Sequence, residues 1–246
     1  MKTNQQPVIS INNLQSYYGE LHALKNINLT IYIGDITVIL GPSGCGKTTL
    51  LKHILGLYQP FSGSISVLDT NMENTTEKGL QNLRKRIGML SQSDALLNSY
   101  TILENLSIAL EQHTQLPPQI IRHMVQVKLD LLGIGETIDK MPDELSGGMK
   151  KRAALGRSIS MDPELLFCDE PTSGLDPITS KRLDNLILSL RDKMDMSVVI
   201  VSHDVSSIRN LADRIVYMEK GEILFAGSIK EAEESGIAGI MDFFAD

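Results

Sequence analysis

This 246-residue sequence predicts an α/β fold built on a mostly parallel sheet. Short β-rich runs alternate with helical patterns along the chain, and such alternation is typical of a parallel sheet covered by helices. The run SVVIVS at 197–202 is apolar on both faces, as expected for a strand that helices cover on each side. No strong strand pattern occurs from about Asp94 to Met161, which we expect to form a helical lobe set into the sheet domain.

The expected elements follow from local pattern. Apolar, β-rich runs predict strands at Val8–Ile11, Ile27–Ile31, Ile36–Leu40, Ile87–Ser91, Leu165–Asp169, Ser197–Ser202, Arg214–Met218 and Glu222–Phe225. Helices are predicted at Gly46–Leu55, Ile102–Leu110, Gln119–Leu132, Met149–Ser160, Pro177–Arg191 and Val205–Leu211. In the third of these helices, apolar residues recur at the spacing of an amphipathic helix, namely at Ile120, Met124, Val127 and Leu131.

Composition and charge narrow the class of protein. Hydrophobic residues make up 42% of the chain, enough for a large buried core. The net charge of −7 argues against a general nucleic-acid binder, because phosphate contacts need clustered Lys and Arg. Two cysteines, Cys45 and Cys168, are too few for a disulfide framework and indicate a reducing compartment. With no apolar run near ~20 residues and no signal-peptide pattern, we expect a soluble protein.

Residues 41–48 read GPSGCGKT and fit the phosphate-binding pattern G-x-x-x-x-G-K-[ST]. The segment lies between a predicted strand and a predicted helix, where backbone N–H groups and a helix N-terminus surround phosphate oxygens. Lys47 can reach the β- and γ-phosphates, and the Thr48 hydroxyl can bind Mg²⁺. The alternative is an ordinary glycine-rich turn. We predict that ATP contacts Gly41, Pro42, Ser43, Gly44, Cys45, Gly46, Lys47, Thr48 and Thr49.

Two carboxylates end the apolar run LLFCDEP at 165–171. Asp169 would face the metal beside the phosphate loop, and Glu170 would orient or deprotonate the water that attacks the γ-phosphate. The alternative is a strand cap with two solvated acids. His203 follows another apolar strand, at the sheet edge where α/β proteins bind ligands, although a lone His is more often structural. Gln92, taken alone, reads as a polar loop residue.

A second glycine-rich segment, LSGGM at 145–149, opens a helical pattern and has the character of a second anion site. With GPSGCGKT, Gln92, LLFCDEP, SGLD and His203 in this order, the chain resembles the ABC (ATP-binding cassette) transporter ATPase family over nearly its whole length. The resemblance implies an ATPase with a P-loop NTPase cassette fold, in which a mostly parallel core carries a small N-terminal antiparallel β part and an inserted helical lobe.

The same resemblance implies one ABC ATPase domain with three parts. The nucleotide-binding core would span 1–92 and 162–227, the helical lobe 93–161, and a C-terminal tail 228–246. It also implies ATP and Mg²⁺ as the bound nucleotide and ion, with Thr48, Gln92 and Asp169 around the metal.

Further roles come from the resemblance position by position. Tyr18, before Gly19, would stack on adenine, and His203 would contact the γ-phosphate. The loop Ser173–Asp176 would communicate across a dimer. Because the chain has one phosphate loop and one signature, two copies are needed, most simply as a homodimer. Contacts to ATP held by the opposite subunit would come from Ser146, Gly147, Gly148 and Asp176.

Details of the lobe point to a cargo. Met149 stands where many importer ATPases have Gln, and the basic run Lys150, Lys151 and Arg152 follows it. This feature, EQHTQLP at 111–117 and SQSDALLNSYTILENL at 91–106 are similar to the Mla/Mce-type phospholipid transport ATPases. That family usually has Phe-Gln where this chain has Ser91-Gln92.

The Mla-type resemblance implies partners and a location. We expect transmembrane permease subunits, a lipid-binding substrate protein, a small regulatory subunit and no nucleic acid, at the cytoplasmic face of the bacterial inner membrane. Two alternatives stay open: an ATPase for another cargo, such as peptides, and a soluble ABC protein that is not a transporter.

The C-terminal residues leave two readings open. Ile237, Ile240, Met241 and Phe244 fall at helical spacing, with Phe243 beside them. The segment would be either a short helix packed on its own domain or a tail that docks on the neighbouring subunit, as in the extensions of Mla-type ATPases.

Overall fold

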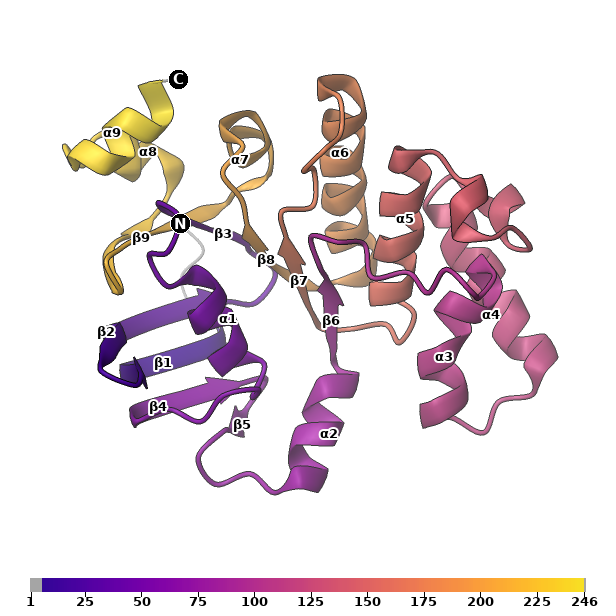
Figure 1. Ribbon diagram of the computed structural model, residues 1–246, viewed down its shortest axis with the longest axis horizontal. Coiled ribbons are helices and arrows are strands. Elements are labelled where there is room, and N and C mark those ends of the chain that lie inside the picture. The colour runs from indigo at the N-terminus through magenta and orange to yellow at the C-terminus, as the bar shows by residue number, and fades with distance from the viewer. Residues whose placement is uncertain (1–5, 246) are drawn as a thin grey trace.

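A computed structural model describes residues 6–245, and its centre is a six-stranded sheet with the order β10-β9-β3-β8-β7-β6 (Figure 1). Neighbouring strands from β9 to β6 run parallel, and β10 pairs antiparallel with β9. The mostly parallel core predicted from the sequence is thereby confirmed. Its strands are β3 (Ile36–Leu40), β6 (Ile87–Leu90), β7 (Leu165–Asp169), β8 (Ser197–Val201), β9 (Arg214–Glu219) and β10 (Glu222–Gly227).

A four-stranded antiparallel sheet with the order β2-β1-β4-β5 confirms the predicted N-terminal β part. The sequence pattern does not indicate β4 and β5, because SGSISV at 62–67 is rich in Ser and Gly, which read as a turn. Pairing with β1 overrides this weak propensity, since Ile65 lies opposite Ile11 and both are buried. The strands are β1 (Pro7–Tyr18), β2 (Leu21–Tyr32), β4 (Ser62–Val67) and β5 (Thr70–Asn71).

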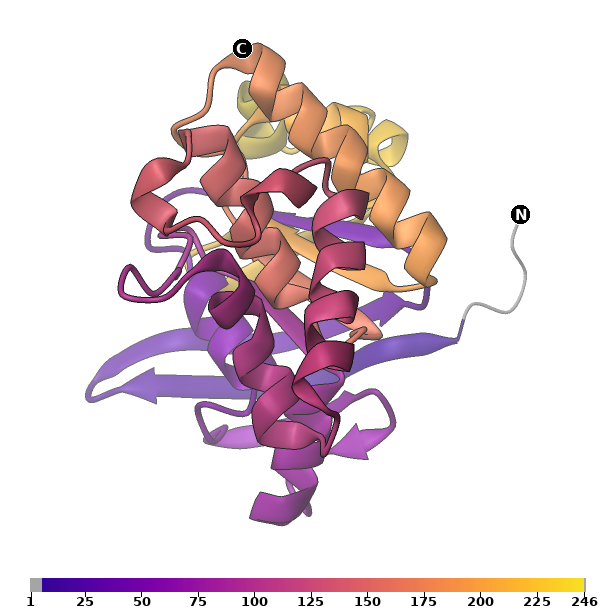
Figure 2. The same ribbon diagram turned by 90° about the vertical axis from the view of Figure 1, so that its right-hand side faces the viewer.

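Each predicted helix is present, with ends that differ by a few residues. The polar helix α2, in which only Leu83 is buried, is not indicated by the sequence pattern. Figures 1 and 2 show α3, α4 and α5 together on one side of the molecule. The helices are α1 (Lys47–Ile54), α2 (Glu77–Lys85), α3 (Ile102–His113), α4 (Pro118–Leu131), α5 (Gly147–Ser158), α6 (Pro177–Met194), α7 (Val205–Leu211), α8 (Ile229–Glu233) and α9 (Ala238–Ala245).

The helical side lacks strands and membrane-spanning helices within the described residues. Residues 93–161 contain helices and no strand, and their division from the core as a separate lobe stays a prediction. None of the helices within residues 6–245 is both long and apolar enough to span a bilayer.

Helix α4 buries a different face from the one its spacing singles out. Ile120, Val127 and Leu131 are 47%, 44% and 37% exposed. The buried side chains are instead Ile121, Val125 and Leu129. The helix carries apolar residues on two faces, so periodicity finds the helix but only its packing against the neighbouring helices selects the buried side.

The parallel sheet separates two hydrophobic cores. Val198 and Ile200 belong to the core under α6 and the helical side, whereas Val199 and Val201 belong to the core shared with α1 and the antiparallel sheet. The strand predicted to be apolar on both faces is therefore buried on both faces. This double coverage fixes the position of each strand end, where the candidate site lies.

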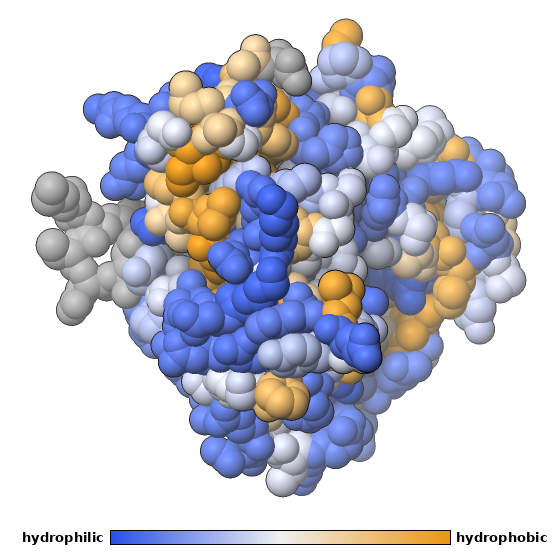
Figure 3. All heavy atoms as spheres, turned by 60° about the vertical axis from the view of Figure 1, so that its left-hand side comes forward, coloured by the Kyte–Doolittle hydropathy of each residue, from blue (hydrophilic) through white to orange (hydrophobic). Residues whose placement is uncertain are grey.

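The C-terminal helix α9 packs on its own domain. Ile240 is fully buried and shares a core with Ile215 and Tyr217 of β9. Helix and strand approach so closely that a Cβ added at Gly239 would lie 2.0 Å from the Tyr217 hydroxyl oxygen. Arg209 of α7 also covers the Phe244 ring, 5.2 Å from its centroid. On the face shown in Figure 3, hydrophobic residues gather near this end of the chain, and most of the rest is hydrophilic.

The packing of α9 on its own domain predicts that this helix contributes to the stability of the fold. Ile240→Ala should lower the free energy of unfolding by about 2–5 kcal/mol, the range for truncating a buried Ile. The matched control is Met241→Ala, since Met241 is 47% exposed and should lose well under half as much. Urea unfolding of both variants measures the difference. Equal stability of the two variants would count against α9 as part of this core.

Candidate functional site

The candidate residues meet at one edge of the parallel sheet. Strands β3, β8, β7 and β6 are neighbours and run parallel, so their carboxyl ends lie along the same edge. Gly41 follows β3, His203 lies two residues beyond β8, Asp169 ends β7 and Gln92 lies two residues beyond β6. Ligands of α/β proteins bind at this edge. Strand order thus brings together residues that are up to 162 positions apart, from Gly41 to His203.

The phosphate loop has little room for side chains at its start. Gly41 has a φ of 146°, and a Cβ there would lie 2.0 Å from the Met218 carbonyl oxygen. Helix α1 begins directly after the loop, and its N-terminus favours an anion. The Lys47 ammonium donates to the carbonyls of Gly41 at 2.7 Å and Pro42 at 3.1 Å, so its charge lies over the loop. Cys45 is buried.

The acidic end of β7 is strained and charged. Glu170 has a φ of 48°, a left-handed conformation that costs a non-glycine residue about 1–3 kcal/mol and is typical of functional sites. Its carboxylate accepts a 2.7 Å hydrogen bond from Nδ1 of His203, whose side chain is 75% exposed. Burial, and then the charge of Glu170, raise the pKa of Asp169, while Lys47 opposes the shift. The predicted catalytic pair and the predicted metal ligand therefore adjoin one another.

The loop after β6 contains a contact that the sequence does not reveal. Gln92 is exposed, and its backbone carbonyl accepts a 2.7 Å hydrogen bond from the Lys151 ammonium of α5. Lys151 is 5% exposed and also pairs with Asp94 at 2.6 Å. A buried lysine with two partners in one loop holds that loop on the helix that carries the signature. The basic run at 150–152 was the only sequence signal for this residue.

The signature lies apart from the phosphate loop of the same chain. Figure 1 places α1 and α5 on opposite sides of β6 and β7. Ser146 caps α5 by accepting from Met149 N–H at 3.4 Å, and Gly147 is exposed. Together with Gly148, these residues line a hollow of about 390 Å³ that also contains Asp176, the N-cap of α6. Within one chain, therefore, the signature residues form a cluster separate from the phosphate loop, made of Ser146, Gly147, Gly148 and Asp176.

Tyr18 ends β1 and is 44% exposed. Its ring makes an edge contact with Tyr58, with centroids 5.8 Å apart. The neighbouring Tyr17 ring is instead stacked on His22 at 4.2 Å. Tyr18 is thus the tyrosine of this pair with no stacked ring partner among the described residues.

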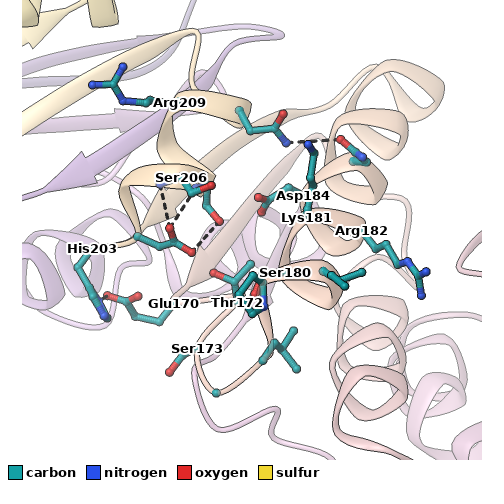
Figure 4. Close-up of a pocket in the computed structure, with 18 residues that line it drawn as sticks. Glu170, Thr172, Ser173, Ser180, Lys181, Arg182, Asp184, His203, Ser206 and Arg209 are labelled. Carbon is teal, nitrogen blue, oxygen red and sulfur yellow. Dashed lines mark hydrogen bonds and ion pairs between the residues drawn. The ribbon is translucent and has the colours of Figure 1, made fainter. Parts of the chain in front are cut away.

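A larger cavity of about 1160 Å³ opens between α6 and α7 and reaches Glu170 and His203 (Figure 4). Asp184 lines it and is 3% exposed, and its Oδ1 has no hydrogen-bond partner within residues 6–245. Burial raises the pKa of Asp184 to about 6, the Ser207 hydroxyl opposes the shift, and repulsion from Asp204 adds to it. No local pattern indicates this carboxyl, because Asp184 lies within an ordinary helical pattern.

Together, the fold and these strand ends define a nucleotide-binding α/β cassette with a phosphate loop, an acidic strand end and a distant signature. The ABC transporter family pattern matches residues 24–173. This chain belongs to that family of ATP-hydrolysing subunits.

Three relatives with different names are similar to this chain at nearly equal identity. One is the intermembrane phospholipid transport system ATP-binding protein MlaF of Haemophilus influenzae, 37% identical over 97% of this chain and 90% of the relative. Another is the methionine import ATP-binding protein MetN of Clostridioides difficile, 36% identical over 91% of this chain and 70% of the relative. The third is the probable ribonucleotide transport ATP-binding protein mkl of Mycobacterium tuberculosis, 36% identical over 89% of this chain but only 61% of the relative.

Solved structures agree on the fold. The cbiO1 subunit from Clostridium perfringens, part of the ABC transporter complex cbiONQ, superimposes with a TM-score of 0.86 at 30% identity, covering 94% of this chain and 92% of that one. The ATP-binding cassette MJ0796, a dimer bound to ADP and phosphate in a post-hydrolysis state, gives a TM-score of 0.80 at 28% identity, covering 90% and 98%.

Asp184 should make stability depend on pH. Because its pKa of about 6 in the folded chain exceeds its ordinary value of 3.8, the protonated form favours folding. The stability that protonated Asp184 contributes is fully present below pH 3.8, the ordinary pKa, and is lost as pH rises through about 6. Asp184→Asn should therefore gain stability over wild type at pH 8, by up to about 3 kcal/mol, and the gain should shrink toward pH 4. Thermal melts across pH measure it, with the exposed Asp242→Asn as control. A gain that does not change with pH would contradict the assignment.

Proposed function

We propose that this chain powers phospholipid transport between bacterial membranes, as a peripheral ATPase subunit held at the cytoplasmic face of the inner membrane by permease subunits. The observation that supports phospholipid as the cargo is the extent of similarity to MlaF. That similarity covers 97% of this chain, against 91% for MetN and 89% for mkl. The lobe segments that resemble the Mla type, including the run at 149–152, belong to the part that would meet a membrane partner. A lipid-binding substrate protein and a small regulatory subunit would complete the assembly.

In this function the loop 41–49 holds the triphosphate. Its backbone N–H groups and the N-terminus of α1 face the phosphate oxygens. Lys47 exchanges its hydrogen bonds to the Gly41 and Pro42 carbonyls for contacts with the β- and γ-phosphates. Tyr18 receives the adenine ring on its exposed surface.

The residues around Asp169 fit Mg²⁺, which prefers oxygen ligands and keeps several waters. Thr48 supplies a hydroxyl, Asp169 a carboxylate and Gln92 a side-chain carbonyl. Burial, and then the like charge of Glu170, raise the pKa of Asp169, and a cation here would offset both effects. When bound, the ion neutralises charge on the β- and γ-phosphates.

Glu170 and His203 carry the hydrolytic step. Glu170 accepts a hydrogen bond from the attacking water and takes its proton as the bond to the γ-phosphorus forms and the β–γ bridging bond breaks. His203 already donates to Glu170 at 2.7 Å, and its exposed ring turns to the γ-phosphate when ATP is present. The strained backbone of Glu170 fixes where its carboxylate points.

The separation of signature and phosphate loop supports a homodimer with two ATP sites. The cluster around Ser146, Gly147 and Gly148 presents a capped helix N-terminus to solvent, far from α1 of its own chain. A second copy would place this cluster, with Asp176, on the ATP of its partner. The MJ0796 cassette, which is dimeric with ADP and phosphate bound, supports the dimer.

Purification of the intact complex from native membranes tests the cargo. We expect permease subunits together with phospholipid, and ATP-dependent movement of labelled phospholipid once the complex is placed in vesicles. Peptide or amino acid in the complex would select the importer alternative. Ribosomes or DNA without a permease would select a non-transport protein.

Glu170→Gln should retain ATP binding and lose turnover by ~10²–10⁴-fold, since the group that accepts the proton from water is gone. The same variant should remain dimeric in ATP, because the nucleotide between the two copies is not consumed. Phosphate release and sedimentation with ATP measure the two effects, and the exposed Glu222→Gln serves as control. Turnover within threefold of wild type would sink the role of Glu170.

A further inference from the structure

Tyr18 is held by a second tyrosine on the loop that follows α1. The Tyr58 ring meets the Tyr18 ring edge to face, at 5.8 Å and 79°. Hydrogen bonding with Tyr18, and then with Lys52, lowers the pKa of Tyr58. The Lys52 ammonium lies 3.3 Å from the Tyr58 hydroxyl oxygen and 5.2 Å from its ring centroid. Tyr58 therefore connects Tyr18 to the last turn of α1.

His53, beside Lys52, fixes the same loop from the other side. It is 1% exposed, and burial lowers its pKa, which favours the neutral ring. Its Nδ1 lies 3.1 Å from the Tyr58 carbonyl oxygen, which can only accept, so Nδ1 carries the proton. Its Nε2 must then accept from the Ser16 hydroxyl at 2.8 Å. One buried imidazole thus ties the Tyr58 backbone to β1, two residues before Tyr18.

These contacts link the two ends of the nucleotide site through one short helix. Lys47 and Thr48 form the first turn of α1, and Lys52 and His53 lie in its last turn. A helix of this length rises about 1.5 Å per residue and does not bend easily. The position of the Tyr18 ring is therefore set relative to the phosphate loop.

We propose that Tyr58, anchored by Lys52 and His53, is a positioning residue that holds the Tyr18 ring at a fixed place relative to the phosphate loop, so that the site recognises a purine base as well as a triphosphate. The inference rests on the proposed role of Tyr18 as the adenine platform. An exposed tyrosine at a strand end would otherwise lose rotamer freedom on binding, and a ring already held in place avoids that cost. Stacking on a base then contributes fully to affinity.

The test compares a ligand with a base and one without. Calorimetry on the full chain, without added Mg²⁺ so that turnover does not interfere, measures the Kd of ATP and of tripolyphosphate. The variants are Tyr18→Ala, Tyr58→Ala, Tyr58→Phe and the double variant Tyr18→Ala/Tyr58→Ala. Phe61→Ala is the matched control, because Phe61 is 74% exposed and contacts the Tyr17 ring instead.

Tyr18→Ala should weaken ATP binding about tenfold, within the range for one base–aromatic stack, and Tyr58→Ala should lose all or part of that effect, about three- to tenfold. Tyr58→Phe, which keeps the ring but not the oxygen, should fall between wild type and Tyr58→Ala and serves if Tyr58→Ala fails to fold. Tripolyphosphate binding should stay within about twofold in every variant, since it has no base to stack. The double variant should match Tyr18→Ala, because Tyr58 acts through Tyr18.

Three outcomes would overturn the inference. If Tyr18→Ala weakens ATP binding but neither Tyr58 variant does, Tyr58 has no positioning role, and the proposed function stands. If the double variant loses the product of the two single effects, Tyr58 contacts the nucleotide by itself. If Tyr18→Ala leaves ATP binding unchanged, the adenine platform is wrong and this inference falls with it, whereas hydrolysis is judged separately by Glu170→Gln.

Discussion

The parallel pairing of β3, β8, β7 and β6 is the constraint on which the site depends. Val38 lies opposite Ile200, Cys168 is also paired with Ile200, and Leu90 is paired with Cys168, so four strands end in step. A shift of one residue in any pair would turn buried side chains to the opposite face of the sheet. Both faces are covered by packed cores, so this register is strongly specified. This register therefore sets the positions of the phosphate loop, of Asp169 and Glu170, and of His203.

Charge and strain concentrate where those strands end. Asp169 and Glu170 are adjacent carboxylates, and Lys47 is the cation that partly offsets them. Glu170 also adopts a left-handed backbone conformation, which only a well-packed neighbourhood can hold. Such a site is costly to the free chain, and the Mg²⁺ proposed to accompany ATP would offset the repulsion between the two carboxylates. Folding stability and nucleotide binding are therefore connected at this edge.

Contacts made by helices connect this edge to the rest of the chain. Lys151 joins the signature helix to the loop of Gln92, and the last turn of α1 joins the phosphate loop to the Tyr58 loop. In both cases a helix N-terminus that the proposed function places on phosphate is followed, within two turns, by a cationic or imidazole side chain that holds a second loop. Movement of α5 would therefore displace both the signature and the Gln92 loop, and movement of α1 would displace both the phosphate loop and the Tyr58 loop.

The sequence by itself determined the α/β class, the predicted helices and the local chemistry of the phosphate loop, because these depend on short patterns such as GPSGCGKT and LLFCDEP. Gln92 became a candidate only through family resemblance, whereas His203 also had a signal of its own because it follows an apolar strand. Tertiary structure decided what depends on packing between distant segments. It selected the buried face of α4, formed β4 from a Ser- and Gly-rich run, and placed α9 on its own domain. It alone gave Lys151, Tyr58 and Asp184 their roles, because burial and partners more than twenty residues away do not appear in any local pattern.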